Sequence, residues 1–332
     1  MHHHQLVEYL VSRGAFVSIE IRDFEYYGRG LWTRRNVEAL EVVMSVPLTE
    51  CIRGDSVIDC AQKLHALKSE EPNHPWFAYL DDVKDLPLLK EDEELTGLGG
   101  GPSLTLEKRR LQAQDLLFEY ALVESRAYWI NNELVLIPLL DLANHRTDAA
   151  YVEFGDGVFS SRDDVVLLPR AQINHNSQIF SSYLPDATNL DTFLSFGFVD
   201  EDNTSLIALD ILINKDDFDF SCNFLKNECY RLALRISFSS SSSLPIIRDD
   251  EYFLSSPDDE ECRLLLEDFI LILAAASSDY SVHYFFERHL ARIPTSYSSP
   301  ILRVVYRDHR RGLLVLRHYV LLMRGKSRTN LL

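Results

Sequence analysis

The order of strand-like and helix-like segments along the chain constrains its fold most. Residues Ala15–Ile21 alternate apolar and polar side chains, as in a half-buried strand, and Glu41–Pro47 is rich in β-branched residues. From about residue 58 to residue 127, apolar residues recur every three or four positions, which is typical of helices. Short strands are then expected again, at Leu134–Leu140, Tyr151–Phe154, Val158–Ser160 and Val165–Leu168. This order predicts a β-rich core with a helical insert.

Helical periodicity returns after about residue 210. Three helices are expected there, over Cys262–Ala276, Val282–Arg292 and Pro300–Arg324. We therefore expect an α+β fold, in which a β-rich core domain over residues 5–205 is followed by an all-helical domain over residues 210–325.

The charge balance limits the partners. The 332 residues include 33 Lys and Arg against 51 Asp and Glu, a net charge of −18. A nonspecific nucleic-acid binder needs positive charge to displace counterions from phosphates, so nucleic acid is an unfavourable partner. A protein partner with a basic segment suits this charge better.

One part of the chain departs from this balance. Eight Lys and Arg residues lie close together near the C-terminus: Arg303, Arg307, Arg310, Arg311, Arg317, Arg324, Lys326 and Arg328. They fit either an RNA-binding surface or a basic helix face that docks on the acidic remainder of the chain, and the net charge favours the second interpretation.

The cysteines and the apolar runs indicate the compartment. The five cysteines are dispersed without any C-x-x-C, which argues against a disulfide framework and against a structural zinc site. No signal-peptide pattern is found at the N-terminus. The most apolar run, Leu264–Ala276, contains Glu267 and Asp268, so no membrane span is expected. We predict a soluble cytoplasmic or nuclear protein without a metal site.

Three separated motifs contain the residue types that bind ligands. The first is Gly28-Arg29-Gly30-Leu31, a turn in which glycine lets the backbone approach a ligand. It does not fit the dinucleotide-binding pattern, because Thr33 stands where the third glycine belongs. Taken alone, this motif indicates a hairpin turn.

The second motif joins Ser125-Arg126 to an apolar run that ends in Asp141-x-x-Asn144-His145. The Asn144 amide can donate to a carboxylate and accept from an ammonium group, which suits the amino-acid end of a zwitterionic ligand. Taken alone, His145 fits a buried core histidine equally, and Arg126 fits an ion-pair partner.

The third motif runs from Ile179–Tyr183, through Asn189 and Leu194, to Phe196-Gly197-Phe198. It combines a strand, a polar loop and a short helix with an aromatic end. An isolated aromatic cluster of this kind most often packs in a core.

Together and in this order, the motifs resemble the SET-domain protein methyltransferases, specifically the branch typified by the Rubisco large-subunit lysine methyltransferase. That branch reads roughly G-x-G-L, V-x-V-P, S-R, D-x-x-N-H and Y-G-x-x-x-N-x-x-L-L-x-x-Y-G-F. The matching positions here are Gly28–Leu31, Val46-Pro47, Ser125-Arg126, Asp141, Asn144-His145, Tyr183, Asn189, Leu194 and Gly197-Phe198. The helical insert and the helical C-terminal part, which in the family helps to hold the protein substrate, are also similar.

The resemblance implies methyl transfer from S-adenosylmethionine to a protein side-chain nitrogen, usually that of lysine. It implies catalytic positions at Tyr183 and Phe196, with Phe180 and Phe198 as further walls of the substrate channel. It also implies a set of cofactor-binding residues: Gly28, Arg29, Gly30, Arg126, Tyr128, Asp141, Asn144, His145 and Phe198.

Phe196 is a departure from the family pattern, because many members have a catalytic tyrosine there. A phenylalanine can form a wall but offers no oxygen to position an amine. Some relatives without this tyrosine methylate histidine. Three functions therefore remain open: a lysine methyltransferase, a histidine-directed methyltransferase, and a noncatalytic SET scaffold that binds a protein.

Overall fold

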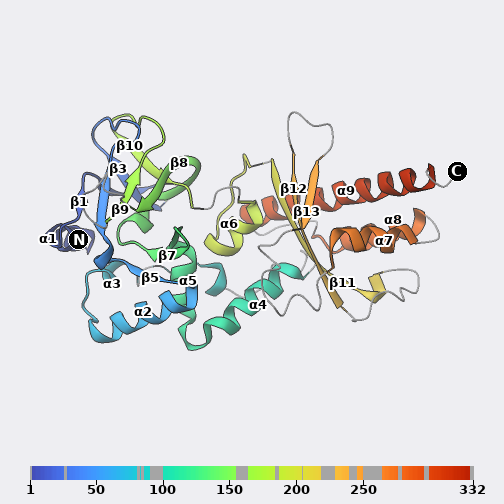
Figure 1. Cartoon of the computed structure of the whole chain (residues 1–332), viewed down its shortest axis with the longest axis horizontal. Coiled ribbons are helices and arrows are strands. Elements are labelled where there is room, and N and C mark those ends of the chain that lie inside the picture. The colour runs from blue at the N-terminus through green and yellow to red at the C-terminus, as the bar shows by residue number, and fades with distance from the viewer. Residues whose placement is uncertain are drawn as a thin grey trace. The chain divides into compact units, whose positions relative to one another are not determined.

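The computed structural model describes residues 2–25, 28–80, 83, 86–89, 100–154, 164–183, 187–203, 205–217, 229–238, 245–249, 264–275, 279–294 and 299–329. The contacts divide the chain into two compact units. Unit 1 comprises Met1–Leu89 and Gln112–Asp186, and unit 2 comprises Lys90–Leu111 and Ala187–Leu332. Each unit is described by itself (Figure 1).

Unit 1 is built on a seven-stranded sheet with the strand order β1-β4-β9-β8-β10-β3-β2. Its strands are β1 (Phe16–Val17), β2 (Glu20–Phe24), β3 (Gly28–Thr33), β4 (Met44–Pro47), β8 (Asn144–Phe154), β9 (Asp164–Leu168) and β10 (Ser177–Ser181). A smaller sheet has the order β5-β7-β6, with β5 (Ile52–Gly54), β7 (Glu133–Leu136) and β6 (Tyr128–Ile130). Most of the predicted strands are therefore present, and the one expected at Val158–Ser160 lies outside the described residues.

β10 lies between β3 and β8, and it brings together those residues of the three motifs that belong to unit 1. β10 pairs antiparallel with β3, where Ile179 lies opposite Leu31, and parallel with β8, where Phe180 lies opposite Asn144. Leu31 and Ile179 are fully buried and form part of the core. The Gly-x-Gly segment, the Asn-His segment and the third motif's first strand consequently lie on adjacent strands (Figure 1).

Helices surround these sheets: α1 (His2–Ser12), α2 (Val57–Glu70), α3 (Phe77–Leu80) and α5 (Leu117–Arg126), with short 3-10 turns at η1 (Leu48–Glu50), η2 (Pro87–Leu89), η4 (Gln114–Leu116) and η5 (Leu140–Leu142). α2 begins after Ser56, whose hydroxyl accepts from the Asp59 backbone N–H at 3.2 Å. α5 ends at Arg126 because Ala127 is extended, with φ −85° and ψ 153°. The chain then enters β6 directly.

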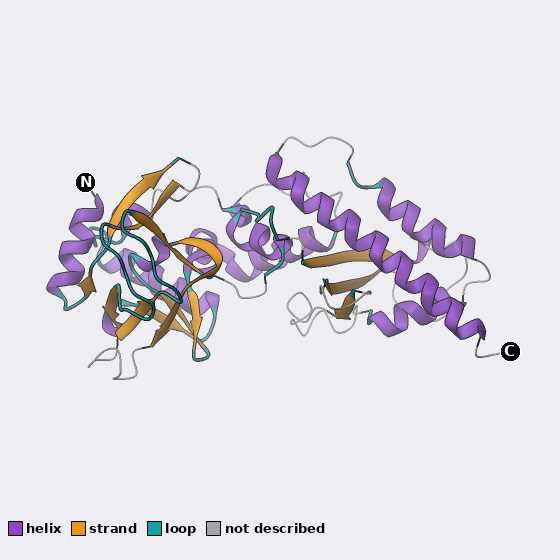
Figure 2. Ribbon diagram, turned by 90° about the horizontal axis from the view of Figure 1, so that it is seen from above, coloured by secondary structure: helices purple, strands orange, loops and turns teal. Residues whose placement is uncertain are grey.

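Unit 2 combines a three-stranded antiparallel sheet with five helices among its described residues. The sheet comprises β11 (Leu206–Asn214), β12 (Cys229–Ser237) and β13 (Ile246–Asp249), and the turn η6 (Lys215–Asp217) follows β11. The helices are α4 (Gly101–Ala113), α6 (Asn189–Phe196), α7 (Leu266–Ala275), α8 (Asp279–Ala291) and α9 (Pro300–Thr329). α8 and α9 pack side by side, and α9 also contacts β11 (Figure 2).

The α+β fold class is confirmed, but the expectation of an all-helical domain over residues 210–325 is wrong. β11 and β12 lie within or enter this range and pair along nine positions, from Leu206↔Ser237 to Asn214↔Cys229. Both strands are buried almost continuously, and in β12 large apolar residues alternate with smaller or polar ones, a strand period that the prediction of helices overlooked.

Part of the expected insert belongs to unit 2. A Cβ atom at Gly101 would lie only 2.3 Å from Asp210 Oδ1, so α4 can approach β11 this closely only through a glycine. The described contacts thus group residues 100–111 and 187–205 with unit 2, rather than with one domain over residues 5–205. The assignment of residues 5–205 to a SET domain stays a prediction.

Other sequence expectations concern single residue types. Cys51, Cys60 and Cys229 are free thiols, while Cys222 and Cys262 lie outside the described residues. Within the described ranges, no helix is both long and apolar enough to cross a membrane. The described His, Cys, Asp and Glu side chains form no group of three that could hold a metal ion.

Candidate functional site

The candidate site of unit 1 lies where β3, β8 and β10 run side by side. Asn144 is the first residue of β8, and its Nδ2 atom donates to the carbonyl oxygen of Arg29 at 3.1 Å. A Cβ atom at Gly30 would lie 2.6 Å from this Nδ2 and 2.7 Å from Nε2 of Gln178. Gly30 therefore has to be a glycine for the two amide side chains to approach β3.

Gly28 serves a different purpose in the same strand. It has a φ of +66°, and no described residue other than its chain neighbours has an atom within 4 Å of the position of an added Cβ atom. Glycine adopts this backbone conformation without steric cost. The backbone here is accessible to a ligand, whereas the backbone at Gly30 is covered by side chains.

A buried ion pair joins α5 to the Asp-x-x-Asn-His turn. Arg126 Nη1 donates to the Asp141 carbonyl oxygen at 2.9 Å and to Asp141 Oδ2 at 3.2 Å. The Asp141 side chain is fully buried, and Arg126 Nε is buried without a hydrogen-bond partner among the described residues. Because a guanidinium has five N–H donors, Arg126 can hold the turn and still bind an anionic group.

The turn itself has an unusual backbone. Leu139 has φ +71° and ψ −40° although it is a fully buried leucine. Such a conformation is costly for a residue with a Cβ and persists only where the surroundings enforce it. The Leu142 N–H donates to the Leu139 carbonyl at 3.0 Å, so the turn is also closed by a hydrogen bond. Asp141 and Asn144 are thus presented by a preset turn.

Tyr183 and His145 are joined by backbone and side-chain contacts. The Tyr183 N–H donates to His145 Nδ1 at 3.1 Å, and the Tyr183 hydroxyl donates to the Ala143 carbonyl. The two rings are 5.2 Å apart at 51°. Since Nδ1 accepts a hydrogen bond, neutral His145 has its proton on Nε2.

The two tyrosines of the site are held as neutral phenols. Their rings lie 6.3 Å apart in an edge-to-face arrangement at 87°. Burial raises the pKa of Tyr183 and of Tyr128 above the usual value of a phenol. Both hydroxyl groups therefore keep their protons near neutral pH.

Two further buried side-chain nitrogens of this region have no hydrogen-bond partner among the described residues. They are Trp32 Nε1 in β3 and Gln178 Nε2 in β10, which lie opposite each other in the sheet. Buried donors without partners are rare in folded proteins. Gln178 was not predicted as a site residue, although polar residues on both sides of Ile179-Phe180 were an available signal.

The expected channel aromatics fall into both units. Phe180 lies in β10, with the Arg146 guanidinium 4.9 Å from the centre of its ring. Phe196 and Phe198 belong to unit 2, where their rings stack 5.8 Å apart at 26°. α6 ends at Phe196 because Gly197 adopts a left-handed φ of +80°. All the other predicted site residues lie in unit 1.

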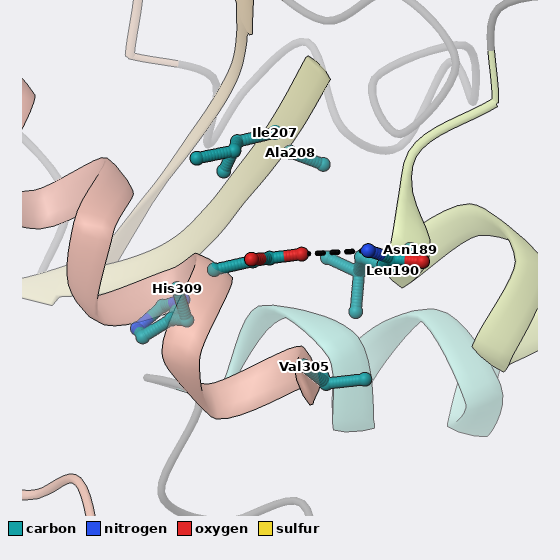
Figure 3. A pocket seen from close by; sticks show the side chains of 7 residues that line it. Asn189, Leu190, Ile207, Ala208, Val305 and His309 are labelled. Carbon is teal, nitrogen blue, oxygen red and sulfur yellow. Dashed lines mark hydrogen bonds between the residues drawn. The ribbon is translucent and has the colours of Figure 1, made fainter. Parts of the chain in front are cut away.

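Unit 2 contains a small buried cavity next to Asn189 (Figure 3). Its volume of about 10 Å³ leaves room for about one water molecule. Asn189 Nδ2 donates to Asp308 Oδ2 at 2.8 Å, and Asn189 Oδ1 accepts from the Asp200 N–H at 2.8 Å. Asn189 consequently ties α6 to α9, and this cavity is not a ligand site.

Comparison with known proteins identifies the fold. No protein-family model matches the chain, and neither does any curated protein sequence. A solved structure of Rubisco LSMT bound to AdoMet is similar, with a TM-score of 0.63 and 15% identity, over 100% of this chain and 93% of that chain. So is the SET domain of LSMT bound to lysine and AdoHcy, with a TM-score of 0.63 and 16% identity, over 98% and 91%. The chain thus has the fold of these SET-domain structures, as its motifs predicted.

Proposed function

We propose that this chain is a protein methyltransferase that uses AdoMet (S-adenosylmethionine) and transfers a methyl group to a side-chain nitrogen of a protein. The proposed acceptor is the side chain of a lysine. The proposal includes a basic segment in the substrate and a cytoplasmic or nuclear location. The main observation in its favour concerns Arg126. Its guanidinium forms an ion pair with Asp141, and its Nε donor is buried and makes no hydrogen bond with a described residue. The fold supports it, because similar solved structures hold AdoMet or AdoHcy.

The residues present fit the chemical groups of AdoMet. Its amino-acid end has a carboxylate, for which Arg126 offers unused N–H donors. The open backbone at Gly28 allows close approach of a ligand, while the bond from Asn144 to the Arg29 carbonyl orders the rest of β3. His145 and Tyr128 complete the proposed set beside Tyr183.

AdoMet, when bound, supplies a methyl group on a positively charged sulfur. Transfer to an amine is an in-line displacement, so the chain contributes mainly by orienting the reacting groups. In this proposal Tyr183 contributes a neutral phenol next to the Ala143 carbonyl, and Phe196, without a hydroxyl, contributes only a wall. A lysine must be deprotonated to react, and lowering its pKa from about 10.4 to about 7 costs about 4.6 kcal/mol. Apolar surroundings favour the neutral amine.

Methyl-labelled AdoMet tests this function. Purified chain is incubated with labelled AdoMet and a cell extract, and labelled proteins are separated and hydrolysed. We expect labelled protein with the wild-type chain and none with Asn144→Ala, which removes the amide that bonds to β3. Methyl-lysine in the hydrolysate supports the lysine assignment, and methyl-histidine supports the histidine-directed alternative. The absence of any labelled protein would contradict the proposal.

A noncatalytic SET scaffold is the second candidate. Phe196 favours it, since it lacks the hydroxyl, and so does the engagement of the Tyr183 hydroxyl with the Ala143 carbonyl. This candidate predicts capture of a protein partner without methyl transfer, and Asn144→Ala would leave that capture unchanged. Loss of cellular function in Asn144→Ala would contradict it.

A further inference from the structure

Between Arg303 and Leu322, the exposed residues of α9 form a single row along one face of the helix. From Arg303 to Leu322 they recur every three or four positions, which places them above one another on a helix. The row consists of Arg303, Arg307, Arg310, Leu314, His318 and Leu322. We call it the α9 row. Its first half is basic and its second half is largely apolar.

The apolar half borders a groove of about 270 Å³. Leu314 and Leu322 line it from α9, while Phe238 and Pro245 line it from the ends of β12 and β13. Leu314 is 44% exposed and Leu322 is 38% exposed. Single exposed leucines are common, but two that share a groove suit the apolar side chains of a partner.

Two arginines in the basic half of the row have no acidic partner among the described residues. Arg303 and Arg310 make no ion pair with any described residue, whereas Arg317, outside the row, pairs with Glu287 at 2.9 Å. The single acidic residue of α9, Asp308, is buried and accepts from Arg307 at 3.0 Å. The described structure therefore gives Arg303 and Arg310 no acidic partner, although the chain as a whole has a net charge of −18.

We propose that the α9 row binds an acidic, amphipathic segment of a partner protein. Carboxylates of that segment pair with Arg303, Arg307 and Arg310, and its apolar side chains enter the groove between Leu314 and Leu322. The 19 helical steps from Arg303 to Leu322 span about 28 Å, which corresponds to about eight residues of extended chain. This surface goes beyond the proposed methyl transfer, for which the substrate segment is expected to be basic.

The groove favours a protein over RNA as the occupant. Phosphates would engage the arginines but would gain nothing from two exposed leucines. The Arg311 guanidinium lies 3.9 Å from the centre of the Phe238 ring, so one face of this aromatic is covered against a stacking base. Carboxylates combined with apolar side chains match both halves of the row.

Direct binding of designed peptides to the full chain tests the proposal. Two fluorescent 12-residue peptides serve as acidic probes. In one, Asp and Glu residues precede Leu and Phe residues, and in the other this order is reversed. Two basic control peptides have Lys in place of Asp and Glu, and single-stranded oligouridylate serves as the RNA probe. The variants are Arg303→Glu with Arg310→Glu, and Leu314→Ser with Leu322→Ser. Leu271→Ser is the control, because Leu271 is a 66% exposed leucine on α7 that does not line the groove.

We expect saturable binding of at least one acidic peptide that weakens with salt, since exposed charges are screened. Each double variant should weaken it by about tenfold or more, as removal of interface anchors does. Leu271→Ser should bind like the wild type. No saturable binding of either acidic peptide, or tighter binding of the Lys peptides, would overturn the proposal. So would oligouridylate binding that depends on the arginines alone, or a wild-type dimer that either double variant dissociates, because the occupant would then be RNA or a second copy.

Discussion

Both units contain a buried Arg–Asp pair, and the two pairs differ in how fully the arginine is used. In unit 2, Arg231 Nε and Nη2 donate to the two carboxylate oxygens of Asp210 at 2.9 and 2.8 Å. Its Nη2 also donates to Thr105 Oγ1 at 2.5 Å. In unit 1, Arg126 reaches Asp141 through Nη1 alone, and its Nε is buried without a partner.

The difference separates a structural pair from a binding residue. The Arg231 side chain is 3% exposed, and its bidentate bond joins the central strand β12 of unit 2 to β11. The Arg126 side chain is 20% exposed, and part of its donor capacity is free. Burial and ion pairing alone would have ranked Arg231 as the more notable residue, so the count of unused donors is the better indicator of a ligand site.

The largest effect is expected when the structural pair is broken. Arg231→Ala leaves the fully buried Asp210 carboxylate without its main cation, which should lower the free energy of unfolding by about 3–5 kcal/mol. Urea unfolding measures this. Arg248→Ala is the control, because Arg248 is an exposed arginine of the same sheet, and it should change stability by less than about 0.5 kcal/mol. Equal losses of stability in the two variants would show that the Arg231–Asp210 pair has no special structural role.

A matched pair of conservative variants separates binding from stability. Arg126→Lys keeps the charge next to Asp141 but removes the planar fork, so AdoMet affinity should fall by about 30-fold, or about 2 kcal/mol. Arg231→Lys should leave AdoMet affinity unchanged and lower stability instead. Calorimetry measures the affinities. If both variants bound AdoMet like the wild type, Arg126 would be another structural arginine.

The larger part of the pH dependence of stability should come from unit 2, although burial also lowers the pKa of His74 in unit 1. Burial, and secondarily the nearby His289, lowers the pKa of His309 to about 3. In the unfolded chain its pKa is about 6.5, so between these values only the unfolded state binds the proton. Stability is therefore full above pH 6.5 and is lost as the pH falls, by about 2 kcal/mol between pH 6.5 and 5.

His309→Gln tests this origin, because it removes the titrating group. Urea unfolding of the variant should change little between pH 6.5 and 5, while a substitution of the exposed His175 should keep the wild-type slope. AdoMet affinity should not follow the same curve, since the raised pKa values of Tyr128 and Tyr183 keep both phenols protonated throughout. If the stability of His309→Gln still fell with pH as that of the wild type does, a group other than His309 would be responsible.

Tyr183→Phe should have the smallest effect on stability. It removes the hydroxyl that donates to the Ala143 carbonyl, a loss of about 1 kcal/mol. The edge-to-face contact of its ring with Tyr128 remains. If Tyr183 orients the substrate amine, methyl transfer should fall well beyond this amount with unchanged AdoMet affinity. Equal transfer rates would remove Tyr183 from the catalytic residues.

The sequence predicted unit 1 well because its motifs are local. Asn144 and His145 directly follow an apolar run, so the sequence alone marks them as a motif. The strand order of the sheet then brings β8, where they lie, close to Gly30 in β3. Gln178 was missed because the polar residues on both sides of Ile179-Phe180 do not by themselves show how close it lies to Gly30, which is more than a hundred residues away in the sequence.

Unit 2 was predicted poorly, although β12 contains a local signal. In its sequence CYRLALRIS every second residue from Tyr230 to Ile236 is large and apolar, which is the period of a strand. The nearly continuous burial of β11 and β12 makes their apolar runs resemble those of buried helices as well. Asp210 and Arg231 resemble the polar positions of a helix until their pairing across the sheet is seen. The helical segment expected between about residues 58 and 127 is also interrupted, because Gln114 adopts a φ of +48° between α4 and α5.

AdoMet binding to the unit 1 site is tested most directly by a calorimetric titration of AdoMet into the wild-type chain and into Asn144→Ala. We expect saturable binding to the wild type, and at least tenfold weaker binding to the variant, which has lost its bond to the Arg29 carbonyl. Equal unfolding transitions of the two proteins would show that the loss is local. No binding to the wild type, or equal binding to both, would contradict the assignment of the unit 1 site.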